Sequence, residues 1–177
     1  MPELIIPTTR LHAAWLESRD EWGRGVHEDG AGLRPEDDVD SPAGFAAFVR
    51  RLTVEEDRAI PAGEGRVHCT YRWMVDGDRI LGAIALRHEL NAFLLDRGGH
   101  IGYGVRPSER RKGLASWALG LMLDEARRLG IDPVLITCHP DNRGSARTIE
   151  KAGGVLEDVR HSGEDAVRRY WIGSGAR

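Results

Sequence analysis

The stretch best suited to chemistry is a basic segment at residues 105–115, Val-Arg-Pro-Ser-Glu-Arg-Arg-Lys-Gly-Leu-Ala, where a predicted strand ends and a predicted helix begins. The first N–H groups of a helix have no acceptor within it and lie at the positive end of its dipole. Gly113 and Ala115 have little or no side chain, so an external group can approach their backbone closely. The segment also carries three basic side chains: Arg110, Arg111 and Lys112. This pattern predicts a phosphate or pyrophosphate site. The alternative is a solvated helix start whose glycine eases packing on the sheet.

Other phosphate-binding and metal-binding motifs are incomplete. The chain has no G-x-x-x-x-G-K-[ST] segment, and Pro107 stands where a dinucleotide fingerprint that starts at Gly102 needs its last glycine. Residues 88–92, His-Glu-Leu-Asn-Ala, begin like a zinc-protease helix but lack the second His. Cys69 and Cys138 lie far apart without Cys/His ligand spacing, so we expect buried, reduced thiols and no metal site. A nucleotide hydrolase, a Rossmann dehydrogenase and a zinc protease are therefore excluded.

Two periodicities predict the elements that position this segment. Alternating or short apolar runs predict strands at residues 3–8, 67–75, 80–86, 100–105, 134–138, 155–159 and 167–172. Helical spacing predicts helices that begin at Thr8 or Thr9, at Ser41-Pro42, at Leu114 and after Asn142. Residues 27–40, 58–66 and 91–98 are predicted to be irregular.

The resulting order, β-α-α-β-β-β-α-β-α-β-β, predicts one α/β domain over residues 1–177. We expect a mixed, mostly antiparallel central sheet flanked by helices. The basic segment joins the strand at 100–105 to the helix that follows it, so these two elements must position the predicted anion site.

The composition narrows the function. The 177 residues, 41% hydrophobic and 30% charged, suit one globular domain. Lys and Arg total 25 against 28 Asp and Glu, a net charge of -3, which disfavours nucleic acid or an anionic membrane as a partner. No apolar run approaches the roughly 18 residues of a membrane span. The N-terminal residues do not resemble a secretory signal, so we expect a cytoplasmic protein.

Two segments resemble the GNAT superfamily of N-acetyltransferases. Arg110-x-x-Gly113-x-Ala115, after a strand that ends in Val-Arg-Pro, is similar to the acetyl-CoA motif of that family. Residues 142–154, Asn-Arg-Gly-Ser-Ala-Arg-Thr-Ile-Glu-Lys-Ala-Gly-Gly, are similar to its N-x-x-S-x-x-x-Y-E-K-x-G-F segment. The predicted element order also matches, so the resemblance spans nearly the whole chain. It implies a GNAT-like fold and transfer of an acetyl group from acetyl-CoA, as co-substrate, to an amine by direct attack in a ternary complex.

The resemblance also implies which groups hold acetyl-CoA. Backbone amides would bind the pyrophosphate, from Arg111, Lys112, Gly113, Leu114 and Ala115. The main chain of Tyr103 and Val105 would pair with the pantetheine arm as an added strand does, and the Val105 N–H would point at the thioester carbonyl. Asn142 and Ser145 would contact the pantetheine or the backbone beside it, although helix capping also explains these two residues.

One position departs from the family pattern. The family often has a Tyr where this chain has Ile149, and that Tyr protonates the departing thiolate. General acid help of this kind is worth about 10²–10⁴-fold, but a thiolate also leaves tolerably without it. Either water or another group supplies the proton, or the chain is a non-catalytic acyl-CoA-binding or sensing module.

The amine needs a base, because an alkyl ammonium has a pKa of about 10. Histidine, with an ordinary pKa of about 6.5, suits this task. Strand alternation puts His100, Gly102 and Gly104 on one face, where the glycines would leave space for a substrate. A hydrogen-bonded structural role is the alternative for His100. His88 and Glu89, at the end of the preceding strand, are the second-choice bases.

The acceptor is the least defined part of the site. Residues 28–40 carry the carboxylates of Glu28, Asp29, Glu36, Asp37, Asp38 and Asp40. They could attract a cationic amine or could form a solvated loop. We expect a small-molecule or peptide amine as substrate, and no nucleic-acid or membrane partner. The terminal strands and Trp171 leave a homodimer open. A nucleic-acid-binding protein, the third hypothesis, rests on residues 110–112 alone.

Overall fold

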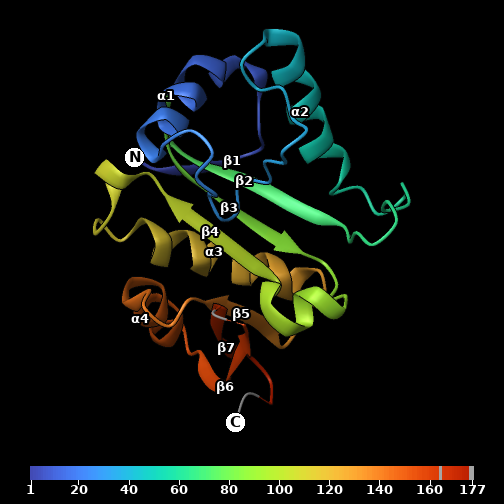
Figure 1. Ribbon diagram of the computed structural model, residues 1–177, viewed down its shortest axis with the longest axis vertical. Helices are drawn as coiled ribbons and strands as arrows, with labels where there is room; N and C mark the ends of the chain where they lie inside the picture. The colour runs from blue at the N-terminus through green and yellow to red at the C-terminus, as the bar shows by residue number, and fades with distance from the viewer. Residues whose placement is uncertain (164, 176–177) are drawn as a thin grey trace.

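A seven-stranded mixed sheet forms the centre of the computed structural model, which describes residues 1–163 and 165–175 (Figure 1). The strands are β1 (Glu3–Ile5), β2 (Cys69–Asp76), β3 (Arg79–Arg87), β4 (Ile101–Val105), β5 (Val134–Cys138), β6 (Val155–Ser162) and β7 (Asp165–Ile172). They lie in the order β1-β2-β3-β4-β5-β7-β6, and each overlaps a strand predicted from the sequence. The predicted α/β fold with a mixed, mostly antiparallel sheet is confirmed.

The helices are α1 (His12–Trp22), which follows a 3₁₀ turn, η1 (Thr9–Leu11), then α2 (Pro42–Val54), α3 (Leu114–Arg128) and α4 (Arg143–Lys151). Predicted capping residues precede α2, α4 and the short turn that leads into α1. The Ser41 hydroxyl accepts the Gly44 N–H at the start of α2, and Thr8 caps η1 in the same way. Figure 1 shows α1 and α2 on one side of the sheet and α3 on the other.

A hydrophobic cluster on each face fastens the helices to the sheet. On one face, Trp15 of α1 and Phe45 and Phe48 of α2 pack with Trp73 of β2. On the other, the apolar stripe of α3 packs on the same strands, with Leu119 fully buried. Because helices cover both faces, β2 is buried on both sides, whereas its alternating pattern predicted a half-buried strand.

The sheet opens between β4 and β5. Every other neighbouring pair is antiparallel, but β4 and β5 run parallel and pair only at Ile101 and Ile136. Beyond Ile101, β4 stays in register with β3 as far as Val105, opposite Gly82, and no described residue pairs with its other edge. The end of β4 that leads into the basic segment therefore lies at a gap in the sheet.

A turn not predicted from the sequence ties this end of β4 to α1. After β4 the chain forms the 3₁₀ turn η3 (Pro107–Glu109). Arg106 is buried, and its guanidinium donates hydrogen bonds to Glu17 and Glu21 of α1. The Ser108 N–H also donates to Glu21. These bonds fix the direction in which the chain enters α3. A π-helical turn, η2 (Leu94–Gly98), also lies within the predicted loop after β3.

Candidate active site

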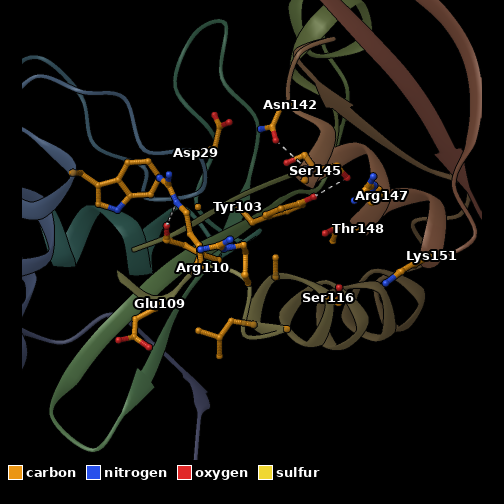
Figure 2. A pocket seen from close by; sticks show the side chains of 18 of the residues that line it. Asp29, Tyr103, Glu109, Arg110, Ser116, Asn142, Ser145, Arg147, Thr148 and Lys151 are labelled. Atoms are coloured by element: carbon orange, nitrogen blue, oxygen red, sulfur yellow. Dashed lines mark hydrogen bonds between the residues drawn. The ribbon is translucent and has the colours of Figure 1, made fainter. Parts of the chain in front are cut away.

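A pocket with a volume of about 780 Å³ lies where the end of β4, the N-terminus of α3 and one face of α4 meet (Figure 2). Trp22 of α1 and His27 and Asp29 of the following loop complete its wall. The basic segment and the 142–154 segment, which are distant in the sequence, line this one pocket.

The N-terminus of α3 presents a run of unpaired backbone donors. Within the described residues, no acceptor is paired with the N–H groups of residues 111–116, and Trp117 is the first to bond back, to the Gly113 carbonyl. Gly113 has φ +84° and Arg111 has φ +63°, so the chain turns through two left-handed residues here. A Cβ placed at Gly113 would meet no atom within 4 Å. The geometry is that of a helix-terminus anion site with room above the backbone.

The three basic side chains before α3 are not equivalent. The Lys112 ammonium pairs with Glu109 at 2.9 Å and does not line the pocket. Arg110 lines it, but its Nε donates to the Val105 carbonyl at 3.1 Å and its guanidinium stacks 4.7 Å over the Trp22 ring. Two of the three basic side chains are therefore held by contacts within the protein.

Two cations that the sequence analysis did not single out face the same pocket. Arg147 and Lys151 lie one turn apart on α4 and line the wall opposite α3 (Figure 2). Their spacing of four residues was the available signal, because it places both on one face of a helix. Together with Arg111, they make the pocket positive where the unpaired N–H groups lie.

The free edge of β4 faces this pocket. The Arg106 N–H donates to the Leu81 carbonyl, and the Arg87 N–H donates to the His100 carbonyl. Hydrogen-bonded positions alternate along an antiparallel pair, so the even-numbered residues of β4 bond to β3. The main chain of Tyr103 and Val105 then points away from β3 into the gap. Both residues line the pocket, as does Gly104.

The side chains of Tyr103 and α4 form the neighbouring wall. Figure 2 shows the Tyr103 ring extending from β4 to α4, where its hydroxyl donates to the Ser145 carbonyl at 3.5 Å. Burial raises the pKa of Tyr103 to about 12. The Asn142 side chain accepts the Ser145 N–H at 3.0 Å, so it caps α4 as well as lining the pocket. Ile149 is fully buried in the core, and α4 presents Thr148 to the pocket instead.

The structure places His100 outside the pocket. It precedes β4 and lies about 13 Å along the strand from Gly104. Its side chain is 6% exposed, and its Nδ1 accepts the Leu135 N–H at 2.9 Å, which joins β4 to β5. Burial and the charge of Arg87 lower the pKa of His100 to about 4. These contacts fit the hydrogen-bonded structural role, which was the alternative for His100. The end of β4 that lies at the gap is the opposite end, at Val105.

The second-choice bases, His88 and Glu89, do not line the pocket either. The His88 ring is buried between Thr70 Oγ1, at 2.8 Å from Nε2, and the Arg58 Nε, which donates to Nδ1 at 3.1 Å. Burial lowers the pKa of His88. Glu89 is exposed in the loop after β3. Both residues follow the end of β3 that pairs with the start of β4. They therefore lie at the same end of this strand pair as His100, away from the gap.

The space predicted beside Gly102 and Gly104 is filled by the loop that follows α1. A Cβ at Gly104 would lie 2.8 Å from the Glu28 Cγ and 3.0 Å from the Asp29 carbonyl oxygen. A Cβ at Gly30 would lie 2.5 Å from the Gly102 carbonyl oxygen. These glycines let the acidic loop lie directly on β4, and they do not leave an open cleft.

Most carboxylates of the acidic segment have structural partners. Asp37 pairs with Arg51 at 2.5 Å, and Asp40 pairs with Arg19 at 2.8 Å. The Asp38 carboxylate accepts hydrogen bonds from Ser41, which lowers its pKa. Asp29, which lines the pocket, contacts His27 at 3.0 Å. The segment is therefore largely a loop held in place by ion pairs and hydrogen bonds, on the side of the sheet that α1 and α2 cover.

Residues 1–163 and 165–175 carry neither a metal-binding cluster nor a membrane-spanning helix. No group of three or more His, Cys, Asp or Glu side chains there could hold a metal ion. No helix of this part is long and apolar enough to cross a bilayer. Cys69 and Cys138 are buried and free, as predicted.

Comparison with known proteins gives one matching family. A family model for an acetyltransferase (GNAT) domain matches residues 35–155. No curated protein sequence matches the chain.

Solved structures share the fold at low identity. The microcin C7 self-immunity acetyltransferase, in complex with acetyl-CoA and AMP, is 14% identical with a TM-score of 0.71 over 97% of this chain and 92% of that one. The ribosomal L7/L12 α-N-protein acetyltransferase, in complex with coenzyme A, is 18% identical with a TM-score of 0.70 over 97% and 93%. The ribosomal-protein-S5-alanine acetyltransferase from Vibrio fischeri is 14% identical with a TM-score of 0.72 over 99% and 95%.

Proposed function

The chain belongs to the GNAT acetyltransferase family, and we propose that it transfers the acetyl group of acetyl-CoA to an amine by direct attack in a ternary complex. The observation that carries the proposal is the run of unpaired N–H groups at residues 111–116, in the same pocket as the free edge of β4. The first feature fits a pyrophosphate, and the second fits an extended arm with amide groups. Coenzyme A carries both groups in one molecule.

In this proposal the two features bind different parts of acetyl-CoA. The N–H groups of residues 111–115 hold the pyrophosphate, with Arg111, Arg147 and Lys151 supplying positive charge around it. The main chain of Tyr103 and Val105 pairs with the amides of the pantetheine arm in the gap between β4 and β5. Lys112 contributes its backbone N–H only, because its side chain pairs with Glu109.

The Val105 N–H supplies the main stabilisation of the reaction. It points into the gap, where it can donate to the thioester oxygen as negative charge develops during attack. Removal of a donor of this kind typically costs about 10²–10³-fold in rate. The amine nitrogen bonds to the carbonyl carbon, the C–S bond breaks, and the sulfur leaves with the bonding electrons.

The departing sulfur meets hydroxyl groups in place of the family's tyrosine. Ile149 is buried in the core, so that position of α4 offers no proton donor. Tyr103, Ser145 and Thr148 line the pocket beside the gap. One of these hydroxyls, or water held by them, protonates the thiolate in this proposal.

The acceptor in this proposal is an amine. The names of the structural relatives include enzymes that act on ribosomal proteins and one of microcin self-immunity, so both protein and small-molecule amines belong in a test. The free, buried cysteines agree with action in the cytoplasm, which we include in the proposal.

The test is incubation of the purified protein with acetyl-CoA and a panel of peptide and small-molecule amines, with free CoA thiol as the readout. We expect release of CoA that depends on the amine. Binding of CoA without release across the panel would instead favour a non-catalytic acyl-CoA-binding module. DNA binding that CoA does not displace would favour the nucleic-acid hypothesis.

A further inference from the structure

One carboxylate beside the pocket, that of Glu28, has no partner among the residues that the structure describes. Glu28 follows His27 and precedes Asp29, which both line the pocket, and its own side chain is partly buried against β4. Within residues 1–163 and 165–175, no hydrogen bond or ion pair joins the Glu28 carboxylate to another residue. The other partly buried acidic side chain of residues 28–40, Asp37, is paired with Arg51. Glu28 therefore has no structural bond that accounts for its burial.

Glu28 lies next to the reacting end of the pocket. Its Cγ lies 2.8 Å from the position of a Cβ on Gly104, the residue before Val105. The sequence supplies glycine at that position, and any larger residue would displace the Glu28 side chain. Asp29, labelled in Figure 2, marks where this loop borders the pocket. The acidic loop and the acetyl-CoA elements thus converge on Gly104 and Val105 from opposite faces of β4.

We propose that Glu28 is the general base for the attacking amine, which enters beside Trp22, His27 and Asp29. This inference rests on the proposed function. The ammonium form of the acceptor gives one proton to the Glu28 carboxylate, and the neutral nitrogen then attacks the thioester carbonyl carbon. The C–S bond breaks, the second proton of the attacking nitrogen passes to the departing thiolate through the pocket hydroxyls or water, and amide and CoA thiol result. Glu28 returns its proton to solvent before the next turnover.

The electrostatic surroundings suit this role. Burial raises the pKa of Glu28 to about 7, and Asp29 adds to this effect, whereas the charge of Arg110 opposes it. A base with a pKa near neutrality is ionised often enough to accept a proton and basic enough to take it from an amine. Arg110 is held by the Val105 carbonyl and the Trp22 ring, so it stays near Glu28 without pairing with it.

The test compares Glu28→Gln with Glu36→Gln, an identical change at an exposed position of the same acidic segment. We expect Glu28→Gln to lower kcat at least tenfold while the Kd for CoA stays within twofold, and Glu36→Gln to change neither. The rate of the wild type should fall on the acid side with an apparent pKa near 7, and this limb should disappear in Glu28→Gln. Glu28→Asp, which keeps a carboxyl group, should restore part of the rate.

Two outcomes would overturn the inference. One is a Glu28→Gln enzyme with kcat within twofold of the wild type. The other is an unchanged acid limb in that variant, which would assign the titration to another group. These outcomes leave the proposed function intact, because acetyl transfer by the wild type is measured in the same experiment. A wild type that binds CoA and acetylates no amine would overturn both proposals.

Discussion

Replacement of Glu28 by Gln should make the folded protein more stable at alkaline pH and leave its stability unchanged at acid pH. A carboxyl group whose pKa is raised by folding contributes stability below its ordinary pKa and loses that contribution as the pH rises through the folded value. For Glu28 the ordinary pKa is 4.5 and the folded value is about 7. The burial that raises the pKa therefore acts against the fold above neutrality.

The magnitude follows from these two values. A difference between 4.5 and about 7 corresponds to at most about 3–4 kcal/mol, at about 1.4 kcal/mol for each tenfold change in proton affinity. Because the side chain is only partly buried, we expect about 2–3 kcal/mol at pH 8 and almost none at pH 4. For a chain of 177 residues this corresponds to a rise in Tm of about 4–12 °C at the higher pH.

The assay is urea unfolding followed by circular dichroism at pH 4, 6 and 8 for the wild type, Glu28→Gln and Glu36→Gln. The difference between Glu28→Gln and the wild type should grow from pH 4 to pH 8, and Glu36→Gln should show no such trend. A difference that is equal at all three pH values would refute the reasoning, because it would mean that Glu28 titrates alike in the folded and unfolded chain. A variant that is both more stable and less active is the result expected of a catalytic carboxylate.

Three further substitutions have defined outcomes. Gly113→Val should weaken CoA binding at least tenfold in calorimetry. A branched side chain would fill the space above the N–H groups, and a φ of +84° is strained for valine. Unaltered affinity would contradict the assignment of an anion site to these N–H groups. His100→Ala should leave kcat within about twofold. It should lower the free energy of unfolding by about 1–3 kcal/mol in urea titrations, since the Leu135 N–H loses its acceptor. A tenfold loss of kcat would instead indicate that His100 takes part in the reaction. Arg169→Met should cost about 2–3 kcal/mol on the same measurement, because Arg169, a residue only 1% exposed, bonds Asp158 at 3.0 Å; a neutral effect would mean that this ion pair contributes nothing.

The sequence predicts those parts of the molecule that local chemistry determines. Caps at Thr8, Ser41 and Asn142 mark helix starts because their side chains bond to nearby N–H groups, and the structure has these bonds. The basic segment predicts a helix-terminus anion site from residue types alone. The burial of Ile149 could also be predicted, because the three-residue spacing of Ala146 and Ile149 places both on one face of α4, which is the buried face.

The proposed base, Glu28, could not be predicted from the sequence because its surroundings arise from tertiary packing. Strand alternation predicts His100 on one face with Gly102 and Gly104, but it does not indicate which end of β4 lies at the gap or which segment covers the glycines. The cover is the loop around Glu28, which has no periodicity and whose place is fixed by contacts with β4. The environment that raises the pKa of Glu28 arises only when that loop packs on the strand.

The most direct test of the central claim is a crystal structure of the protein with CoA bound. We expect the pyrophosphate within hydrogen-bond distance of the N–H groups of residues 111–115, and the pantetheine arm in the gap between β4 and β5 with its sulfur near Val105. The Glu28 carboxylate should lie on the acceptor side of that sulfur. CoA bound elsewhere, or an arm that does not pair with β4, would contradict the account.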